Sequence, residues 1–187
     1  MGHDQKDGTD LPRKLTIQPN IGLDAHARQS VVVMLNTTLA DEAILMAKTR
    51  SAFWHNVGTE RLSLQPLLEA QTQQLNGIAY EIAERVRILG GFVVGSFEEV
   101  LQQTRLAEQP GQVPHPMRLL ADHEAFIRFL REDVRRCYEA FEDHGTFALL
   151  TQVLRTQEKM AWMLRSCLQT DLTTEEIQIS QDGSTRQ

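Results

Sequence analysis

The 187-residue sequence predicts an all-α protein, a four-helix bundle with a short helix in the crossover between the second and third long helices. Apolar residues recur at spacings of three, four and seven in four long segments, which is typical of helices that bury one face. Glycine and proline number only 11 and 6, too few for the many turns of an all-β protein. The sequence predicts an irregular arm at 1–22, the bundle at 23–170 and an acidic tail at 171–187.

The first two long helices are predicted from about Asp24 to Gly58 and over 60–89. The Asp24 side chain can cap the first helix, and Gly58 marks its end. The second helix ends at Gly90 and Gly91, because glycine adopts the left-handed cap conformation without strain. Their apolar stripes are Leu35, Leu39, Met46 and Phe53 in the first helix, and Leu64, Leu68, Leu75, Ile78, Ile82, Val86 and Leu89 in the second.

A capping box at Ser96 and Glu99 predicts a short helix over 97–104. A polar, proline-containing loop separates it from a third long helix at 117–143. The fourth helix is predicted over 146–169, capped by the threonine at its start. The connection between the last two helices is short, so they are predicted to be antiparallel neighbours.

Composition excludes several classes of protein. The net charge of −6, with 25 acids and 19 bases, argues against DNA binding, and neither end of the chain is basic. No run approaches the roughly 18 apolar residues of a membrane span, and no signal peptide is evident, which predicts a cytoplasmic protein. Met160, Trp162 and Met163 have the spacing of packed core residues, so no haem is expected.

Five short motifs occur in a characteristic order: LNTTLADEAILMAKTR followed by Trp54, IAERVRILGG at 82–91, GSF at 95–97, DH at 122–123 and EKMAWMLR at 158–165. Together, over residues 25–169, they resemble the Dps family, ferritin-like cages named for DNA-binding proteins from starved cells. The resemblance implies a ferritin-like bundle, assembly into a homododecamer, iron storage and protection from oxidative stress. It also implies oxidation of ferrous iron by peroxide or oxygen at two-fold subunit interfaces.

The implied ferroxidase ligands are largely replaced in this chain. Family members use two histidines and an aspartate from one subunit, and an aspartate and a glutamate from its neighbour. Here Phe53 and Gln65 stand at the histidine positions and Glu69 at the first aspartate. In the neighbour's set Tyr80 replaces the aspartate, and only Glu84 is kept. Two carboxylates remain, with no imidazole.

The spacing of these residues constrains any metal site. Gln65, Glu69, Tyr80 and Glu84 share one helix face, but Glu69 and Glu84 are about 22 Å apart at the helical rise per residue. They can share an ion only if an antiparallel copy of the helix brings one chain's Glu69 beside the other's Glu84. Oxygen ligands accept ferrous iron, manganese, magnesium or calcium. A bulge at the end of the first helix could add His55.

Two further polar positions, Glu42 and His123, lie on apolar stripes. Glu42 is predicted to face the bundle interior and to need a partner there, because an unpaired buried charge is costly. His123 is predicted to be a satisfied core histidine, and Gln157 replaces a histidine often found before the EK motif. A metal centre inside the bundle is disfavoured, because the fourth helix lacks an ExxH motif. By resemblance, Glu142 and Asp143 lie near an acidic cage pore.

These observations predict a Dps-like cage that sequesters iron and protects against oxidative stress. Whether it is a ferroxidase stays open. One interpretation is an atypical, histidine-poor iron site, with Glu69, Glu84, Gln65, Tyr80 and His55 as candidate ligands. The alternative is a structural or binding cage without a working di-iron centre.

Overall fold

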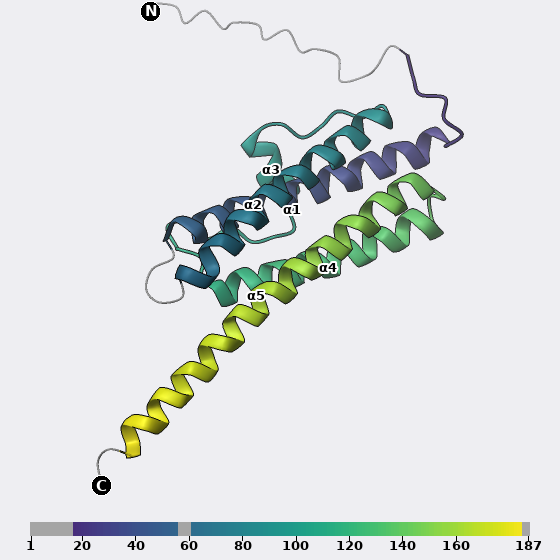
Figure 1. Cartoon of the computed structure of the whole chain (residues 1–187). Coiled ribbons are helices and arrows are strands. Elements are labelled where there is room, and N and C mark those ends of the chain that lie inside the picture. The colour runs from purple at the N-terminus through teal and green to yellow at the C-terminus, as the bar shows by residue number, and fades with distance from the viewer. Residues whose placement is uncertain (1–16, 56–60, 185–187) are drawn as a thin grey trace, which may run out of the picture.

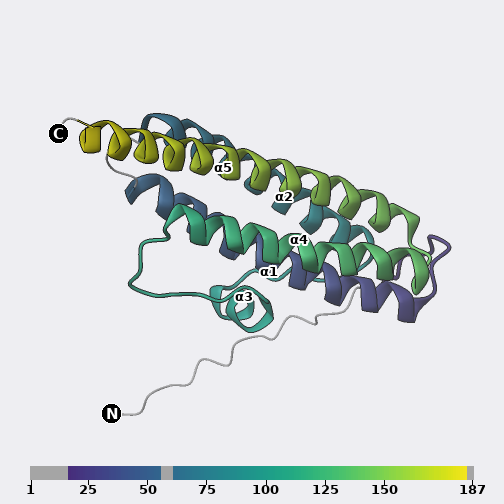
Figure 2. The same cartoon turned by 90° about the horizontal axis from the view of Figure 1, so that it is seen from below.

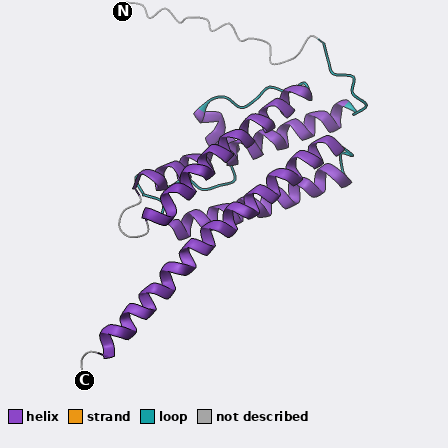
Figure 3. Ribbon diagram, in the orientation of Figure 1, coloured by secondary structure: helices purple, strands orange, loops and turns teal. Residues whose placement is uncertain are grey.

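The computed structural model describes residues 17–55 and 61–184, with the backbone alone at Arg61 and over 170–184. It contains five helices and no strand in these ranges (Figures 1 and 3): α1 (Ala25–His55), α2 (Arg61–Ile88), α3 (Phe97–Gln103), α4 (Pro116–Glu139) and α5 (His144–Ser184). The all-α fold class predicted from the sequence is therefore confirmed. Gly58 and most of the predicted arm lie outside the described residues.

The four long helices pack as two pairs, α1 with α2 and α4 with α5, which join through α1–α4 and α2–α5 contacts (Figures 1 and 2). The apolar stripes meet in one core, in which Leu35, Leu64, Leu75, Phe126 and Leu150 are completely buried. The segment between α2 and α4 crosses the bundle and lays α3 against α1. The predicted crossover helix is thus present at its predicted place.

Helix α1 is long and apolar enough to cross a membrane by length and composition. Its burial inside the bundle identifies it instead as a core helix. Asp41, Glu42 and Lys48 are buried on it, and each contacts a partner from another part of the chain. Buried ionisable groups need such partners, because their desolvation is otherwise uncompensated.

Two predicted helix starts are confirmed. The Asp24 carboxylate accepts hydrogen bonds from the backbone N–H groups of His26 and Ala27, both at 2.9 Å. The Ser96–Glu99 capping box begins α3. At the end of α2, Gly90 has a φ of 82°, and a Cβ there would lie 2.8 Å from the ring of Pro19, so only glycine fits.

The predicted start and end of the last helix are wrong. Asp143 caps α5, not Thr146: its carboxylate accepts from the Thr146 backbone N–H at 3.0 Å and from the Thr146 hydroxyl at 2.6 Å. The helix therefore begins at His144, and the threonine lies in its first turn. At its other end α5 continues to Ser184 and projects beyond the bundle (Figure 1).

Arg105 fastens the crossover to the bundle. Its guanidinium donates to Asp41 of α1 at 2.7 Å and lies 2.9 Å from Asp133 of α4. It also lies over the ring of Phe129, 4.6 Å from the ring centroid. Burial raises the pKa of the Asp133 carboxyl, and the arginine opposes that shift by favouring its ionised form. One cation thus compensates two buried carboxyls and fixes the loop after α3.

Candidate functional site

Four of the five predicted metal ligands lie along the outer face of α2. Glu69, Tyr80 and Glu84 are exposed, with 67% of Tyr80 accessible, and Gln65 is half-buried. The buried residues of α2 lie on the opposite face. The two glutamates are separated by fifteen residues of continuous helix, about 22 Å. One chain therefore presents these residues in a row and does not bring them together.

His55 lies at the C-terminal end of α1. Its Nδ1 is 2.8 Å from the Ser51 carbonyl oxygen, one helical turn earlier. The helix remains regular through His55, without the bulge considered from the sequence. Phe53, which the resemblance aligns with a family ligand, is half-buried and packs against the apolar core.

The described residues contain no group of three or more histidine, cysteine, aspartate or glutamate side chains placed to hold a metal ion. The described side chains of one chain therefore do not form a di-iron centre on their own. Cys137 is buried, and burial raises the pKa of its thiol to about 12, which disfavours the thiolate. Any site built on Glu69 and Glu84 needs a second copy.

The centre of the bundle holds a different polar group, formed by α1, α4 and α5. The Gln157 amide nitrogen donates to Glu42 at 3.0 Å, and the Gln157 amide oxygen accepts from His123 Nδ1 at 2.9 Å. All three side chains are completely buried. The predicted interior positions of Glu42 and His123 are confirmed, and the residue that joins them is the glutamine at the family's histidine position.

Burial shifts the pKa values of both titratable groups in the direction that favours their neutral forms. It raises the pKa of Glu42 well above its usual range, while the Gln157 hydrogen bond opposes the shift. Burial lowers the pKa of His123 to about 4. The imidazole is therefore neutral near pH 7, with its proton on Nδ1 where Gln157 accepts it. A carboxyl and an imidazole kept apart by an amide make a structural network rather than a metal centre.

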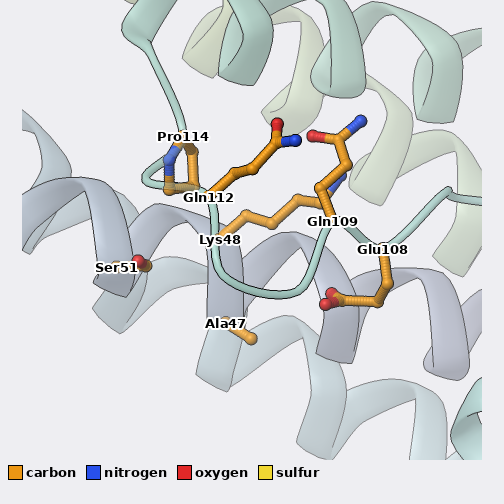
Figure 4. Close-up of a pocket in the computed structure, with 7 residues that line it drawn as sticks. All are labelled: Ala47, Lys48, Ser51, Glu108, Gln109, Gln112 and Pro114. Atoms are coloured by element: carbon orange, nitrogen blue, oxygen red, sulfur yellow. The ribbon is translucent and has the colours of Figure 1, made fainter.

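A small pocket of about 110 Å³ lies between α1 and the loop before α4 (Figure 4). Lys48 runs beneath the loop and donates to the Ala107 carbonyl oxygen at 2.6 Å and to Asp122 at 2.8 Å. Its ammonium group therefore holds the loop before α4 in place through these two contacts. None of the five predicted ligands lines this pocket, which is formed by Ala47, Lys48, Ser51, Glu108, Gln109, Gln112 and Pro114.

The two acids expected near a cage pore have different environments. Asp143 is only 2% exposed, because it caps α5 and pairs with Arg85 at 2.7 Å. Glu142 is exposed, in the left-handed backbone region with a φ of 51°. Only Glu142 presents its carboxylate to solvent in this turn, so Asp143 serves the fold.

Comparison with known proteins identifies the family. A model of the ferritin-like domain matches residues 33–172. A DNA protection during starvation protein from Agrobacterium fabrum is 28% identical over 79% of this chain and 93% of its own length. The structure of DpsC from Streptomyces coelicolor superposes with a TM-score of 0.77 at 30% identity, over 83% of this chain and 92% of that one. The chain belongs to the Dps family.

Two further proteins are similar to this Dps family member. A low temperature-induced protein of Nostoc, itself uncharacterized, is 42% identical over 80% of this chain and 86% of its own length. A Dps structure from Vibrio cholerae, described as a ferritin-like diiron-carboxylate protein, has a TM-score of 0.74 at 27% identity. It covers 82% of this chain and 98% of that one. The family thus suggests iron binding.

Sequence reasoning missed one structural role and one association. The double use of Asp143, as helix cap and as partner of Arg85, is signalled only by its place three residues before Thr146. The link between Glu42, Gln157 and His123 joins positions up to 115 residues apart, so local spacing alone could not reveal it.

Proposed function

We propose that this Dps family member assembles with copies of itself into a cytoplasmic cage that binds and sequesters iron and protects against oxidative stress. The observation that carries the proposal is the outer face of α2, where Glu69, Tyr80 and Glu84 lie exposed in a row. Carboxylates on an otherwise polar face are suitable ligands for ferrous iron, which in this proposal is the cargo. The proposed assembly is a dodecamer with metal sites at its two-fold interfaces.

Gly77 supports the position of the two-fold axis. An antiparallel pairing that brings Glu69 of one copy beside Glu84 of the other has its axis midway, between positions 76 and 77. Glycine inside a helix costs about 1 kcal/mol relative to alanine, and a Cβ at Gly77 would meet nothing within 4 Å in one chain. No described contact within one chain requires a glycine at this position. At the axis, however, the missing side chain allows two helices to approach closely.

At this interface we propose two equivalent oxygen-ligand sites, each combining Glu69 of one copy with Glu84 of its partner. Gln65 and Tyr80 flank the glutamates, and His55 is a further candidate ligand. Two ferrous ions would give two electrons to one hydrogen peroxide, which takes up two protons and leaves as two water molecules. Without imidazole ligands, the site is expected to bind iron more weakly than the family's usual centre.

The alternative is a cage without a working di-iron centre, which Phe53 favours because it packs against the core at a ligand position. Anaerobic ferrous loading followed by peroxide, monitored by ultraviolet absorbance against a protein-free blank, separates the two. Oxidation well above the blank supports the shared site, provided that E84Q and E69Q lower it. The matched control is E81Q, which neutralises an exposed glutamate elsewhere on α2.

Unchanged oxidation in E84Q would show that the site is misplaced, and a wild-type rate equal to the blank would favour the ferroxidase-inactive cage. Assembly is tested separately by analytical ultracentrifugation. The wild type is expected to sediment at about twelve times the chain mass of 21.3 kDa. G77R should split the two-fold contact, whereas Q74R, exposed on another side of α2, should leave it intact.

A further inference from the structure

The surface of α4 and α5 is basic although the chain as a whole is acidic. Between Pro116 and Gln169, eight lysine and arginine side chains reach the surface, against five carboxylates. The central part of this surface is called here the basic surface, and Trp162 lies exposed on it to 59%. It consists of Arg128, Arg131 and Arg135 on α4, and Arg155, Lys159 and Arg165 on α5.

Three cations of the basic surface are already paired. Arg131 pairs with Glu158 and Arg165 with Glu124, and both pairs bridge α4 and α5. Arg135 pairs with Glu132 on its own helix. Arg128, Arg155 and Lys159 form no ion pair within the described part of the chain and are exposed. The basic surface therefore has three cations available for an anionic partner.

The end of the chain has the opposite charge. Residues 170–187 contain Asp171, Glu175, Glu176 and Asp182 against Arg186, a net charge of −3. Positions 171, 175 and 182 share one helical face by their spacing. Here α5 runs straight out of the bundle (Figure 1), and an isolated helical segment of this length is marginally stable in water. The end of α5 therefore needs a surface to pack on, and it points away from its own bundle (Figure 1).

We infer that the acidic extension of one copy docks on the basic surface of a neighbouring copy. The three available cations match the net charge of the extension. Positions 171 to 182 span about 16 Å of helix, and positions 155 to 165 about 15 Å. Leu172 and Ile179, seven residues apart, form a short apolar stripe that can cover Trp162. The inference rests on the proposed assembly of identical subunits.

Zero-length carbodiimide cross-linking tests the contact, because it joins a carboxylate to an amine only where the two touch. Lys159 is the one amine of the basic surface. In assemblies formed from mixed light and heavy nitrogen-labelled chains, mass spectrometry should detect Lys159 joined to Asp171, Glu175 or Glu176 of the other isotope. The cross-link from Lys159 to Glu176, a carboxylate that D171N/E175Q/D182N retains, should fall about tenfold in that variant, since several surface ion pairs are lost together.

Raising the sodium chloride concentration to about 1 M, where the Debye length is near 3 Å, should also reduce these cross-links. Cross-links confined to single chains, or absent from an intact assembly, would overturn the inference. Two results together would assign the surface to nucleic acid instead. D171N/E175Q/D182N would assemble with the same resistance to salt as the wild type, and R128Q/R155Q/K159Q would lose affinity for duplex DNA. A chain that sediments as a monomer would overturn the proposed cage as well, so the two failures are distinguishable.

Discussion

Gln157 lies between Glu42 and His123, donating to the carboxyl at 3.0 Å and accepting from the imidazole at 2.9 Å. A single amide thus joins two buried titratable groups on two other helices, while the Nε2 atom of His123 is buried without a hydrogen-bond partner among the described residues. In the Dps family this position often carries a histidine. A neutral imidazole also has one donor and one acceptor, but it would add a third titratable group to the network. The amide of Gln157 joins the two groups without adding one.

The buried carboxyl of Glu42 should cost stability at neutral pH. Its folded pKa is raised well above the usual value for a glutamate, so the unfolded chain releases a proton that the folded chain retains. The free energy of unfolding therefore falls as pH rises above the unfolded pKa. We expect E42Q to raise the melting temperature by about 2–4 °C at pH 7 and to change it little at pH 4. E139Q, at an exposed position, is the control.

The titration of His123 should change the free energy of unfolding in the opposite direction, at lower pH. Its pKa is lowered from 6.5 to about 4, so between these pH values the unfolded chain binds a proton that the folded chain does not bind. The free energy of unfolding should therefore decrease by about 3 kcal/mol as pH falls from 6.5 to 4. Urea unfolding should be measured at several pH values across this range. The free energy of unfolding should change less steeply with pH in H123N than in the wild type. An equal slope in H123N would refute the assignment, and H26N, at an exposed position, should keep the wild-type slope.

Loss of the Asp143 carboxylate should destabilise the protein strongly. D143A removes the cap of α5 and leaves Arg85 without its carboxylate partner at 2.7 Å. A cost of about 2–4 kcal/mol is expected in chemical denaturation. The neighbouring E142G should instead be neutral or stabilising, because glycine accepts the φ of 51° without strain. Equal effects of the two substitutions would contradict the separate roles assigned to these acids.

Arg105 should control the order of the crossover loop. R105A leaves the buried carboxyls of Asp41 and Asp133 without their shared cation. We expect a loss of about 3 kcal/mol, with faster amide hydrogen exchange over residues 104–115. R118A, at an exposed arginine near the start of α4, is the control and should leave the exchange unchanged. Unaltered exchange in R105A would show that Lys48 alone holds the loop.

Much of the fold could be predicted because its signals are local. The apolar spacing of Leu64 to Leu89 and the capping box of Ser96 and Glu99 depend on residues one or two turns apart, and both appear as predicted. The candidate site was harder to predict for the same physical reason. Glu69 and Glu84 share a helix face, as their spacing requires, but whether they meet a partner's carboxylates depends on contacts outside one chain.

The sequence by itself determined the four amphipathic helices and the crossover helix, because each follows from residue types at fixed spacing. Only the tertiary structure decided that Asp143 is a buried cap and that Gln157 joins Glu42 to His123. Those contacts join segments far apart in the chain, or depend on burial. A carboxylate that is an ordinary solvated charge in sequence becomes, once desolvated, either a paired ion or a neutral acid.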